Sequence, residues 1–362
     1  MLRPGSERGK LALMSMHNIY FAIPGNLQSL TGGYAYDRRL LAELQQLGLP
    51  IRYHALADGF PYAEATALAA ADHWLQSLPD QSTVMVDGLA FAVMDELAVT
   101  HSQRLRFCAL CHHPLALETG LDAAAQARLQ QSEQRALAVA KQVIVTSTRT
   151  RQILTERFAV PAERITVALP GTDRHGSAPC IGQPPRLLAV ASLTPRKAHD
   201  VLIAALAQLQ HLSWQALLVG GDEFDPKWAK QLRQQVLALG LQQRIIFAGG
   251  KHDLHTDYMA ADVFVLPSWY EGYGMAFAEA LSYGLPIIAA RAGAVPEVVP
   301  ETAGILVEPG NVGMLAAALQ QILTDAGLRR RLQTGARAAA LQLPTWQKTA
   351  LTVRDVLMRA TE

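Results

Sequence analysis

Two acidic residues, Glu271 and Glu279, flank a loop that contains Gly272 and Gly274. The apolar run Val263–Leu266 predicts a strand before this loop, and a helix is expected directly after it. Glycines let the backbone approach a ligand closely, and the free N–H groups of a helix start favour a phosphate or an electron-rich sugar oxygen. Ionised carboxylates nearby would accept hydrogen bonds from paired hydroxyl groups. The segment therefore predicts a site for a ligand that carries phosphate and hydroxyl groups.

An isolated pair of this kind has a simpler interpretation, in which the glycines make a turn and Glu279 is a solvated helix residue. The longer string Pro267–Pro286, however, resembles the E-x7-E signature of the retaining glycosyltransferases of family 4. Besides the two glutamates, the positions that match the wider pattern are Pro267, Ser268, Gly272, Gly274, Ala280, Gly284 and Pro286. The resemblance implies a GT-B fold, which is α/β with two Rossmann-like, doubly wound parallel-sheet domains that face a cleft.

The same resemblance implies a role for each matching residue. Glu279 would hold the ribose hydroxyls of a nucleotide-sugar donor, and Glu271 would position the hydroxyls of the sugar that is transferred. The other donor-binding residues would be Gly249, Gly272, Tyr273, Gly274 and Met275. We expect a UDP- or GDP-linked sugar, although the residues do not decide between uracil, guanine and adenine.

A second segment, Val190–Ala198, resembles the family motif that supplies cations to the donor diphosphate. Lys197 stands on the motif lysine, whereas Ser192 replaces the motif arginine. Arg196 is the candidate for the second charge, at a different offset and therefore in a different geometry. The alternative is an exposed basic pair at a helix start. We take Lys197 and Arg196, with Glu271, as catalytic candidates.

The N-terminal half offers a glycine pair and a strand-end histidine. Gly32 and Gly33 open a predicted helix and would let the chain pass close to a diphosphate or an acceptor, although a plain turn explains them almost as well. Asp37, in the same helix, is as readily interpreted as part of an exposed face as of an acceptor site. His112 follows the apolar run Arg106–Cys111, where sites in such sheets gather. The family resemblance gives it a contact with the transferred sugar and makes it the fourth catalytic candidate, with His113 as the alternative.

Cys108–His112 also has the C-x-x-C-H spacing of a c-type haem attachment site. The two cysteines lie within an apolar strand that would point them to opposite faces, and no export signal precedes them. Cys180 is the only other cysteine, so a zinc site with four cysteine ligands is excluded. Buried structural cysteines are the better interpretation.

Short apolar runs alternate with segments of helical period along the chain, which is typical of parallel sheets covered by helices. The predicted strands include Asn18–Ile23, Thr83–Val86, Arg106–Cys111, Gln142–Thr146, Arg186–Val190, Ala216–Val219, Ile245–Ala248 and Val263–Leu266. The rhythm breaks at the proline- and glycine-rich segment Leu169–Pro185. We therefore expect an acceptor-side domain over residues 1–175, a donor domain over 176–342, and a C-terminal helix over 343–362, anchored by Trp346, that crosses back onto the first domain.

The bulk composition fits a two-domain enzyme. The chain has 362 residues, of which 50% are apolar and 17% charged, and its net charge of +1 gives no support to nucleic-acid binding. Few cysteines and no long apolar run favour a cytoplasmic protein, and the family leaves contact with the inner face of the membrane open. Met1–Ser15 is expected to be an upstream extension.

The function implied by the resemblance is transfer of a sugar, with retention, to a glycan, lipid-linked or small-molecule acceptor. No Asp-x-Asp triplet occurs, so we expect no metal, and no cofactor beyond the donor substrate. The alternatives are a GT-B sugar-nucleotide epimerase and a non-catalytic sugar-nucleotide-binding protein, the latter suggested by Ser192.

Overall fold

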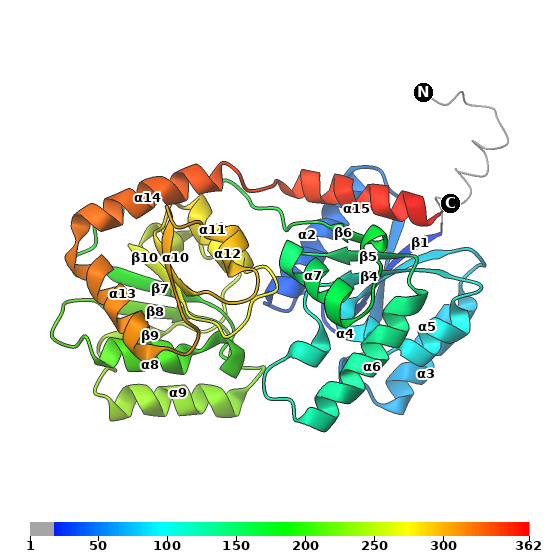
Figure 1. The fold of residues 1–362 in the computed structure, drawn as a ribbon, viewed down its shortest axis with the longest axis horizontal. Coiled ribbons are helices and arrows are strands. Elements are labelled where there is room, and N and C mark those ends of the chain that lie inside the picture. The colour runs from blue at the N-terminus through cyan, green and yellow to red at the C-terminus, as the bar shows by residue number, and fades with distance from the viewer. Residues whose placement is uncertain (1–17, 362) are drawn as a thin grey trace. The chain divides into compact units, whose positions relative to one another are not determined.

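The computed structural model describes residues 18–361, which form two compact units (Figure 1). Of the described residues, unit 1 contains 18–29, Gly33–Gly171 and 346–361, and unit 2 contains Leu30–Gly32 and Thr172–Thr345. The chain thus leaves unit 1 at Gly171 and returns at Trp346, where the sequence predicted boundaries after residues 175 and 342. The predicted extension Met1–Ser15 lies outside the described residues, and the cleft between the domains stays a prediction.

Unit 1 is built on a six-stranded parallel sheet with the strand order β2-β1-β3-β4-β5-β6. Its central strands β1 and β3 are buried along their whole length, which explains why they are continuous apolar runs. The strands are β1 Ile19–Pro24, β2 Ile51–Leu56, β3 Thr83–Asp87, β4 Arg106–Cys111, β5 Gln142–Val145 and β6 Ile165–Val167. Because all strands run the same way, the ends of β3 and β4 lie at one edge of the sheet.

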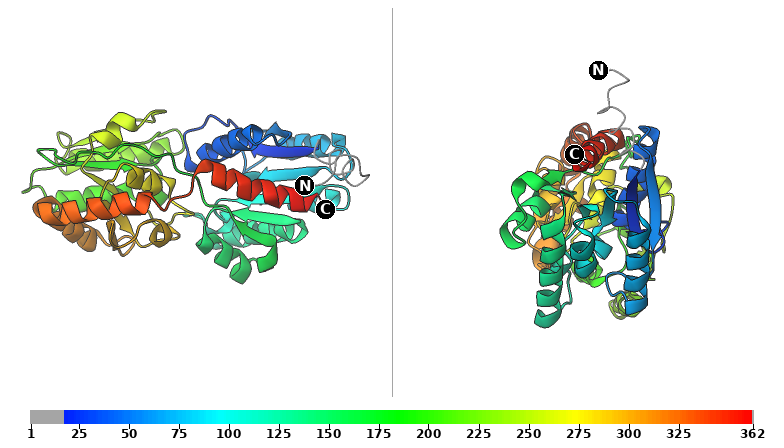
Figure 2. Two further views of the ribbon diagram at one scale, coloured as in Figure 1. Left: turned by 90° about the horizontal axis from the view of Figure 1, so that it is seen from above. Right: turned by 90° about the vertical axis from the view of Figure 1, so that its right-hand side faces the viewer.

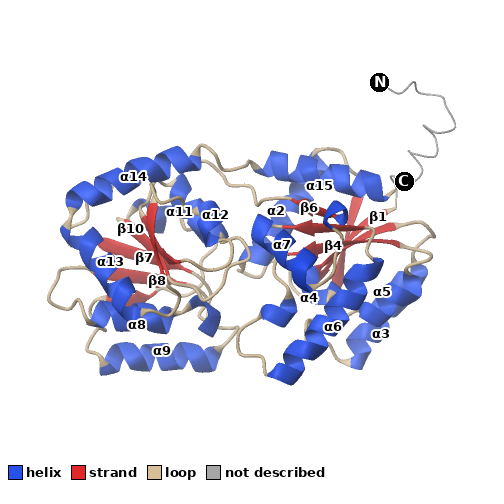
Figure 3. Ribbon diagram, in the orientation of Figure 1, coloured by secondary structure: helices blue, strands red, loops and turns tan. Residues whose placement is uncertain are grey.

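Helices cover both faces of this sheet (Figure 3). They are α2 Gly32–Gln46, α3 Ala65–Ser77, α4 Gly88–Phe91, α5 Asp95–His101, α6 Ala123–Val139, α7 Thr148–Arg157 and α15 Trp346–Ala360, with the 3-10 turns η1 Leu115–Leu117 and η2 Ala162–Arg164. The last helix, red in Figure 2, packs along β3, β4 and β5. The Trp346 ring at its start is buried 5.7 Å from the ring of Tyr36, so a large apolar surface fixes this helix to unit 1.

Unit 2 repeats the plan with a second six-stranded parallel sheet in the order β12-β11-β10-β7-β8-β9. Its strands are β7 Arg186–Val190, β8 Gln215–Val219, β9 Ile245–Phe247, β10 Val263–Leu266, β11 Ile287–Ala290 and β12 Gly304–Val307. Its helices are α8 His199–Ala207, α9 Pro226–Ala238, α10 His255–Met259, α11 Met275–Ser282, α12 Val295–Val298, α13 Val312–Thr324 and α14 Ala326–Ala340, with the 3-10 turn η3 Pro195–Lys197. Strands β7 and β10 are neighbours, which brings the loops that follow them together.

The architecture confirms the predicted α/β class with two doubly wound parallel sheets. The eight strands predicted from apolar runs are all present, with ends that agree or differ by one residue. None of the helices among residues 18–361 is long and apolar enough to cross a membrane.

Candidate functional site

The best-defined site in unit 2 is a buried ion pair between the loops that follow β7 and β10. The Lys197 ammonium donates to both carboxylate oxygens of Glu271, with Nζ 2.7 Å from Oε1 and 3.0 Å from Oε2. The Ser268 hydroxyl donates to Glu271 Oε1 over 2.7 Å. Glu271 is only 6% exposed, so this carboxylate is held by two partners in a largely water-excluded place.

The charges around Glu271 decide its ionisation. Burial by itself raises the pKa of Glu271, but the cations of Lys197 and Arg196, together with the hydrogen bonds from Lys197 and Ser268, outweigh burial and lower that pKa. Glu271 is therefore a carboxylate at neutral pH, and Lys197 is an ammonium facing it. Such a pair presents one fixed cation and one fixed hydrogen-bond acceptor to a ligand.

Arg196 places a second cation beside Glu271, and its contact with a donor diphosphate stays a prediction. Its guanidinium donates to the Tyr270 carbonyl over 3.0 Å and lies 3.8 Å from a Glu271 carboxylate oxygen. The backbone ties the same two loops together, because the Trp269 N–H donates to the Arg196 carbonyl. The two basic residues of η3 therefore flank Glu271 rather than forming an exposed basic pair.

Two glycines with left-handed backbone shape the loop around Glu271. Gly274, with φ +94°, stands at the N-cap of α11, and a Cβ there would lie 2.5 Å from Phe277. Gly293, with φ +55°, lies against the Glu271 backbone, and its neighbour Ala294 donates an N–H to the Glu271 carbonyl. The loop after β11 thus packs against the backbone of the loop after β10 and holds Glu271 in place.

The remaining donor candidates take different positions in the loop and beside it. Met275 is the first residue of α11, so the free N–H groups of that helix begin directly after Gly272 and Gly274. The Tyr273 ring is only 6% exposed, and burial raises the pKa of its hydroxyl to about 12. Gly249, beyond β9, has φ +70° and open space where a Cβ would stand.

Glu279 lies on α11 and receives a hydrogen bond over 3.1 Å from the Tyr258 hydroxyl. Burial raises the pKa of Glu279, which the Tyr258 hydrogen bond opposes and the charge of Asp173 increases. Glu279 is therefore no solvated helix residue, which excludes the simpler interpretation of the E-x7-E segment.

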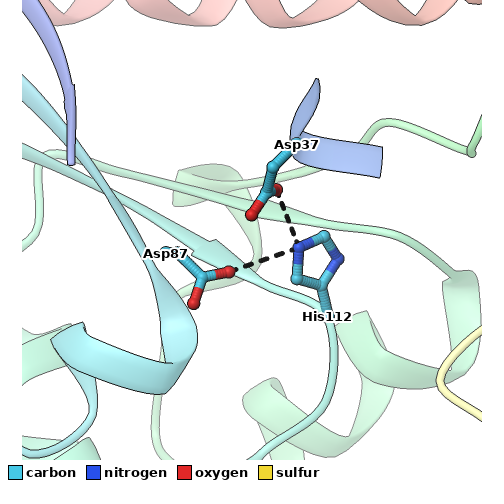
Figure 4. A group of neighbouring side chains, drawn as sticks. All are labelled: Asp37, Asp87 and His112. Atoms are coloured by element: carbon cyan, nitrogen blue, oxygen red, sulfur yellow. Dashed lines mark hydrogen bonds and ion pairs between the residues drawn. The ribbon is translucent and has the colours of Figure 1, made fainter. Parts of the chain in front are cut away.

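Unit 1 has a second cluster of charged side chains, in which His112 lies between two carboxylates (Figure 4). Its Nε2 is 3.0 Å from Asp37 Oδ1 and 3.4 Å from Asp87 Oδ2. Both aspartates are at most 2% exposed. Gly33 lies beside the same ring, since a Cβ there would be 3.6 Å from His112 Cδ2. Of the two candidate histidines, His112 is the one that contacts the carboxylates.

The sequence interpretation of Asp37 as part of an exposed face is wrong. Asp37 lies on the inner side of α2 with Tyr36, Leu40 and Leu44, so the helix face that carries it points to the core. Its two arginine neighbours in the sequence gave the segment a solvated appearance.

Asp87 was not singled out from the sequence at all. Its Oδ1 accepts the Leu89 N–H over 2.8 Å and so caps α4, which leaves the other oxygen for His112. An acid directly after a strand and before a glycine was the signal that could have identified it.

The three charges of this cluster are strongly coupled. Burial alone would lower the pKa of His112, but Asp37 and Asp87 raise it to about 10. Burial and the Asp87 charge raise the pKa of Asp37. The cluster thus offers both a hydrogen-bond donor and carboxyl oxygens that can accept from a hydroxyl. The same set, one nitrogen and two oxygens within 4.8 Å of one another, is also of the kind that can hold a divalent cation.

We expect the His112 imidazole to remain protonated throughout the range from pH 6 to 8, because both neighbouring carboxylates favour the charged ring. A group whose pKa is raised on folding stabilises the fold fully below its unfolded pKa of about 6.5 and loses that contribution as the pH rises toward 10. Histidine ring resonances followed by NMR across this pH range test it. A His112 midpoint near 6.5, unchanged by Asp37→Asn, would contradict this arrangement.

The cysteines of the C-x-x-C-H motif are structural. Cys108 and Cys111 are both buried and unpaired, and burial raises the pKa of the Cys108 thiol to about 12. Cys111 Sγ lies 4.0 Å from the buried Glu133 carboxylate. Neither thiol is placed to attach a haem, as the sequence indicated.

Comparisons with known proteins agree with these observations. Residues 176–339 match the family model described as Glycosyl transferases group 1. D-inositol 3-phosphate glycosyltransferase of Xylanimonas cellulosilytica is 30% identical over 252 residues, which are 64% of this chain and 60% of that protein. MMP alpha-(1->4)-mannosyltransferase of Mycolicibacterium hassiacum is 32% identical over 212 residues, or 57% and 51% of the two chains. The chain thus spans little more than half the length of the curated relatives it matches.

Solved structures match almost the whole chain. Sucrose-phosphate synthase of Thermosynechococcus elongatus has a TM-score of 0.79 at 22% identity, with 93% of this chain and 98% of that chain covered. HepE of Anabaena, in complex with UDP and glucose, has a TM-score of 0.72 at 19% identity and the same coverage. Residues 176–339 of this chain are therefore similar to the group 1 glycosyl transferases, and the chain as a whole has the two-unit α/β fold of the GT-B type.

Proposed function

We propose that this chain is a retaining, metal-independent glycosyltransferase of family 4. It moves a hexosyl group from a nucleoside-diphosphate sugar to a hydroxyl of a glycan, a lipid-linked or a small-molecule acceptor. The observation that carries the proposal is the Lys197–Glu271 pair, 2.7 Å apart, beside the N-terminus of α11. This arrangement places a fixed cation and a fixed carboxylate near the free N–H groups at the start of α11.

These groups match the parts of a nucleoside-diphosphate sugar. The free N–H groups after Gly274 and the cations of Lys197 and Arg196 attract the diphosphate. The Glu271 carboxylate accepts hydrogen bonds from hydroxyls of the transferred hexose, and Glu279 accepts those of the ribose.

The same cations supply the catalytic effect. Breaking the bond between the sugar and the diphosphate leaves negative charge on the departing phosphate, and preorganised cations stabilise charge that develops in the transition state. Lys197 and Arg196 are held by Glu271 and the Tyr270 carbonyl, so little reorganisation is needed. The departing phosphate oxygen then accepts the proton of the acceptor hydroxyl, which balances the transfer without a separate base.

The cluster of Asp37, Asp87 and His112 in unit 1 binds hydroxyl groups of the sugar substrates. His112, as an imidazolium, donates to a sugar oxygen, and the carboxyl oxygens of Asp37 and Asp87 accept from hydroxyl donors. Because both carboxylates already share the His112 proton, we expect no divalent cation in this cluster. Two cations beside Glu271 also argue against the binding-only alternative that Ser192 suggested.

The solved relative with bound UDP and glucose supports UDP-glucose as the first donor to test. The curated relatives named as glycosyltransferases of inositol phosphate and as a mannosyltransferase support polyhydroxyl acceptors and GDP-linked donors as further choices. A cytoplasmic location and contact with the inner face of the membrane remain predictions.

We expect slow release of the nucleoside diphosphate from one donor in a panel of UDP-glucose, GDP-mannose and ADP-glucose, since water replaces a missing acceptor. The rate should be unchanged by a chelator such as EDTA. The measurement is coupled detection of UDP, GDP or ADP. Release from none of the donors, with or without sugar acceptors, would contradict transfer, and a rate abolished by EDTA and restored by Mn²⁺ would contradict metal independence.

A further inference from the structure

The Glu279 carboxylate is oriented by one side chain, Tyr258. The Tyr258 hydroxyl donates to Glu279 Oε2 over 3.1 Å, and Glu279 makes no other side-chain hydrogen bond among residues 18–361. We propose that Tyr258 is a positioning residue that turns Glu279 toward a ribose diol, and that selection of ribose over 2′-deoxyribose therefore depends on the Tyr258 hydroxyl. The inference rests on the proposed function of Glu279 in donor binding.

Tyr258 can hold Glu279 because it is itself fixed. Its side chain, on α10, is fully buried, and its ring stacks on that of Tyr283 at 4.8 Å with an interplanar angle of 8°. Phe264 of β10 lies beyond it, with ring centroids 6.2 Å apart. A fully buried tyrosine in contact with two other rings loses few rotamers on forming its hydrogen bond, so the hydroxyl stays in place before a ligand arrives.

The ring of Tyr283, which stacks on Tyr258, has further contacts of its own. Tyr283, at the end of α11, places its hydroxyl 3.1 Å from His255 Nδ1. The ring of His175 stacks on Tyr283 at 4.4 Å with an interplanar angle of 4°. His175, Tyr283, Tyr258 and Phe264 are thus linked by successive ring contacts within unit 2, and Tyr258 donates its hydroxyl to Glu279.

The hydrogen bond from Tyr258 also opposes the rise that burial causes in the pKa of Glu279. Burial disfavours the charged carboxylate, and a donor that binds the charged form counteracts this. With Oε2 held by Tyr258, the plane of the carboxylate is set and Oε1 is presented. A vicinal diol binds both sides of a carboxylate only when that plane is fixed, whereas a single hydroxyl binds a rotated carboxylate almost equally well.

The consequence is a specific effect of Tyr258→Phe. The variant keeps the stacked ring and loses only the hydroxyl, so the carboxylate turns and the second ribose contact is lost. Binding of UDP should weaken about tenfold, whereas binding of 2′-deoxy-UDP should change by less than about threefold. The ratio of the two dissociation constants therefore falls.

Tyr283→Phe is the matched control, because it removes a hydroxyl from the neighbouring ring of the same stack. That hydroxyl is hydrogen-bonded to His255, whereas the Glu279 carboxylate accepts its hydrogen bond from Tyr258. The ratio of dissociation constants for 2′-deoxy-UDP and UDP should stay at the wild-type value in this variant. A merely structural role of the stack would move both variants together.

Isothermal titration calorimetry with UDP and 2′-deoxy-UDP on the full chain tests the inference, with GDP and its deoxy form used if wild type prefers them. A Tyr258→Phe ratio equal to that of wild type overturns it. Wild type that binds no nucleoside diphosphate overturns the proposed function first. If Tyr258→Phe loses stability, the substitution is made in a Glu279→Ala variant instead. There Tyr258→Phe should leave the ratio of the two dissociation constants unchanged, because the carboxylate that it orients is absent. A tenfold change of that ratio between Glu279→Ala and the double variant also overturns the inference.

Discussion

Replacing Lys197 by methionine is expected to reduce nucleotide release from the donor by roughly a hundredfold to a thousandfold. Methionine fills a similar volume but removes the cation that faces the departing diphosphate. The side chain of Lys197 is 17% exposed and the side chain of Glu271 only 7%, so little water can replace the lost charge. Steady-state rates of the wild type and the variant, measured with the best donor of the panel, give the effect on kcat.

The same substitution leaves Glu271 as a buried carboxylate without its main partner, at a cost to stability of roughly 3 kcal/mol. The double variant Lys197→Met, Glu271→Gln removes both charges, and we expect it to recover much of that stability without recovering activity. Loss of stability and loss of chemistry are thereby separated.

Lys251 provides the matched control, because its ammonium also pairs with a carboxylate in unit 2, that of Asp257, over 2.8 Å. This pair lies at the surface beyond β9, with 36% of the Lys251 side chain exposed. Lys251→Met should keep the wild-type rate within about threefold. An active Lys197→Met variant, or an equal loss in both variants, would contradict the role of Lys197 in the chemistry.

The second large effect is expected for Gly293→Ala. A Cβ at this position would lie 2.1 Å from the Glu271 carbonyl oxygen and 2.9 Å from its nitrogen, both of them backbone atoms that cannot rotate away. The φ of +55° adds the cost of a left-handed alanine. We expect a loss of at least about 2 kcal/mol in the free energy of unfolding. Displacement of Glu271 should also lower the rate by roughly a hundredfold.

Gly240→Ala isolates the steric part of this effect. Gly240 has a similar left-handed φ of +69° and nothing within 4 Å of a Cβ. It should lose only about 1 kcal/mol and keep full activity. Chemical denaturation of both variants, together with their rates, measures the difference. A Gly293→Ala variant as stable and as active as Gly240→Ala would show that the loop after β11 does not support Glu271.

The sequence predicted the local structure of Val263–Ser282 well because its features are local. A strand, a glycine loop and a helix start follow one another within Val263–Ser282, so residue types alone place Glu271 and Glu279 near free N–H groups. The partnership of Lys197 with Glu271 depends on more than local sequence. It arises because β7 and β10, far apart in the chain, are neighbours in the sheet.

The cluster of unit 1 could be predicted only in part. His112 was identified from its place after β4, but Asp37 and Asp87 reach it from α2 and from the end of β3. Whether Asp37 points inward depends on which face of α2 packs on the sheet. The two arginines that follow Asp37 in the sequence made that face look exposed. The bond from Tyr258 to Glu279 likewise requires one side chain of α10 to come within hydrogen-bond distance of one on α11, which no spacing in the sequence reveals.

The central claim, transfer with retention from a nucleotide sugar, is tested most directly by the nucleotide-release reaction followed at the anomeric carbon. Wild-type protein, UDP-glucose and EDTA are mixed, and the anomeric protons are recorded by NMR before mutarotation equilibrates the sugar. GDP-mannose and ADP-glucose replace UDP-glucose if they are the better donors. The account predicts UDP together with α-glucose as the first product. The β-anomer as the first product, or no sugar release from any of the three donors, would contradict it.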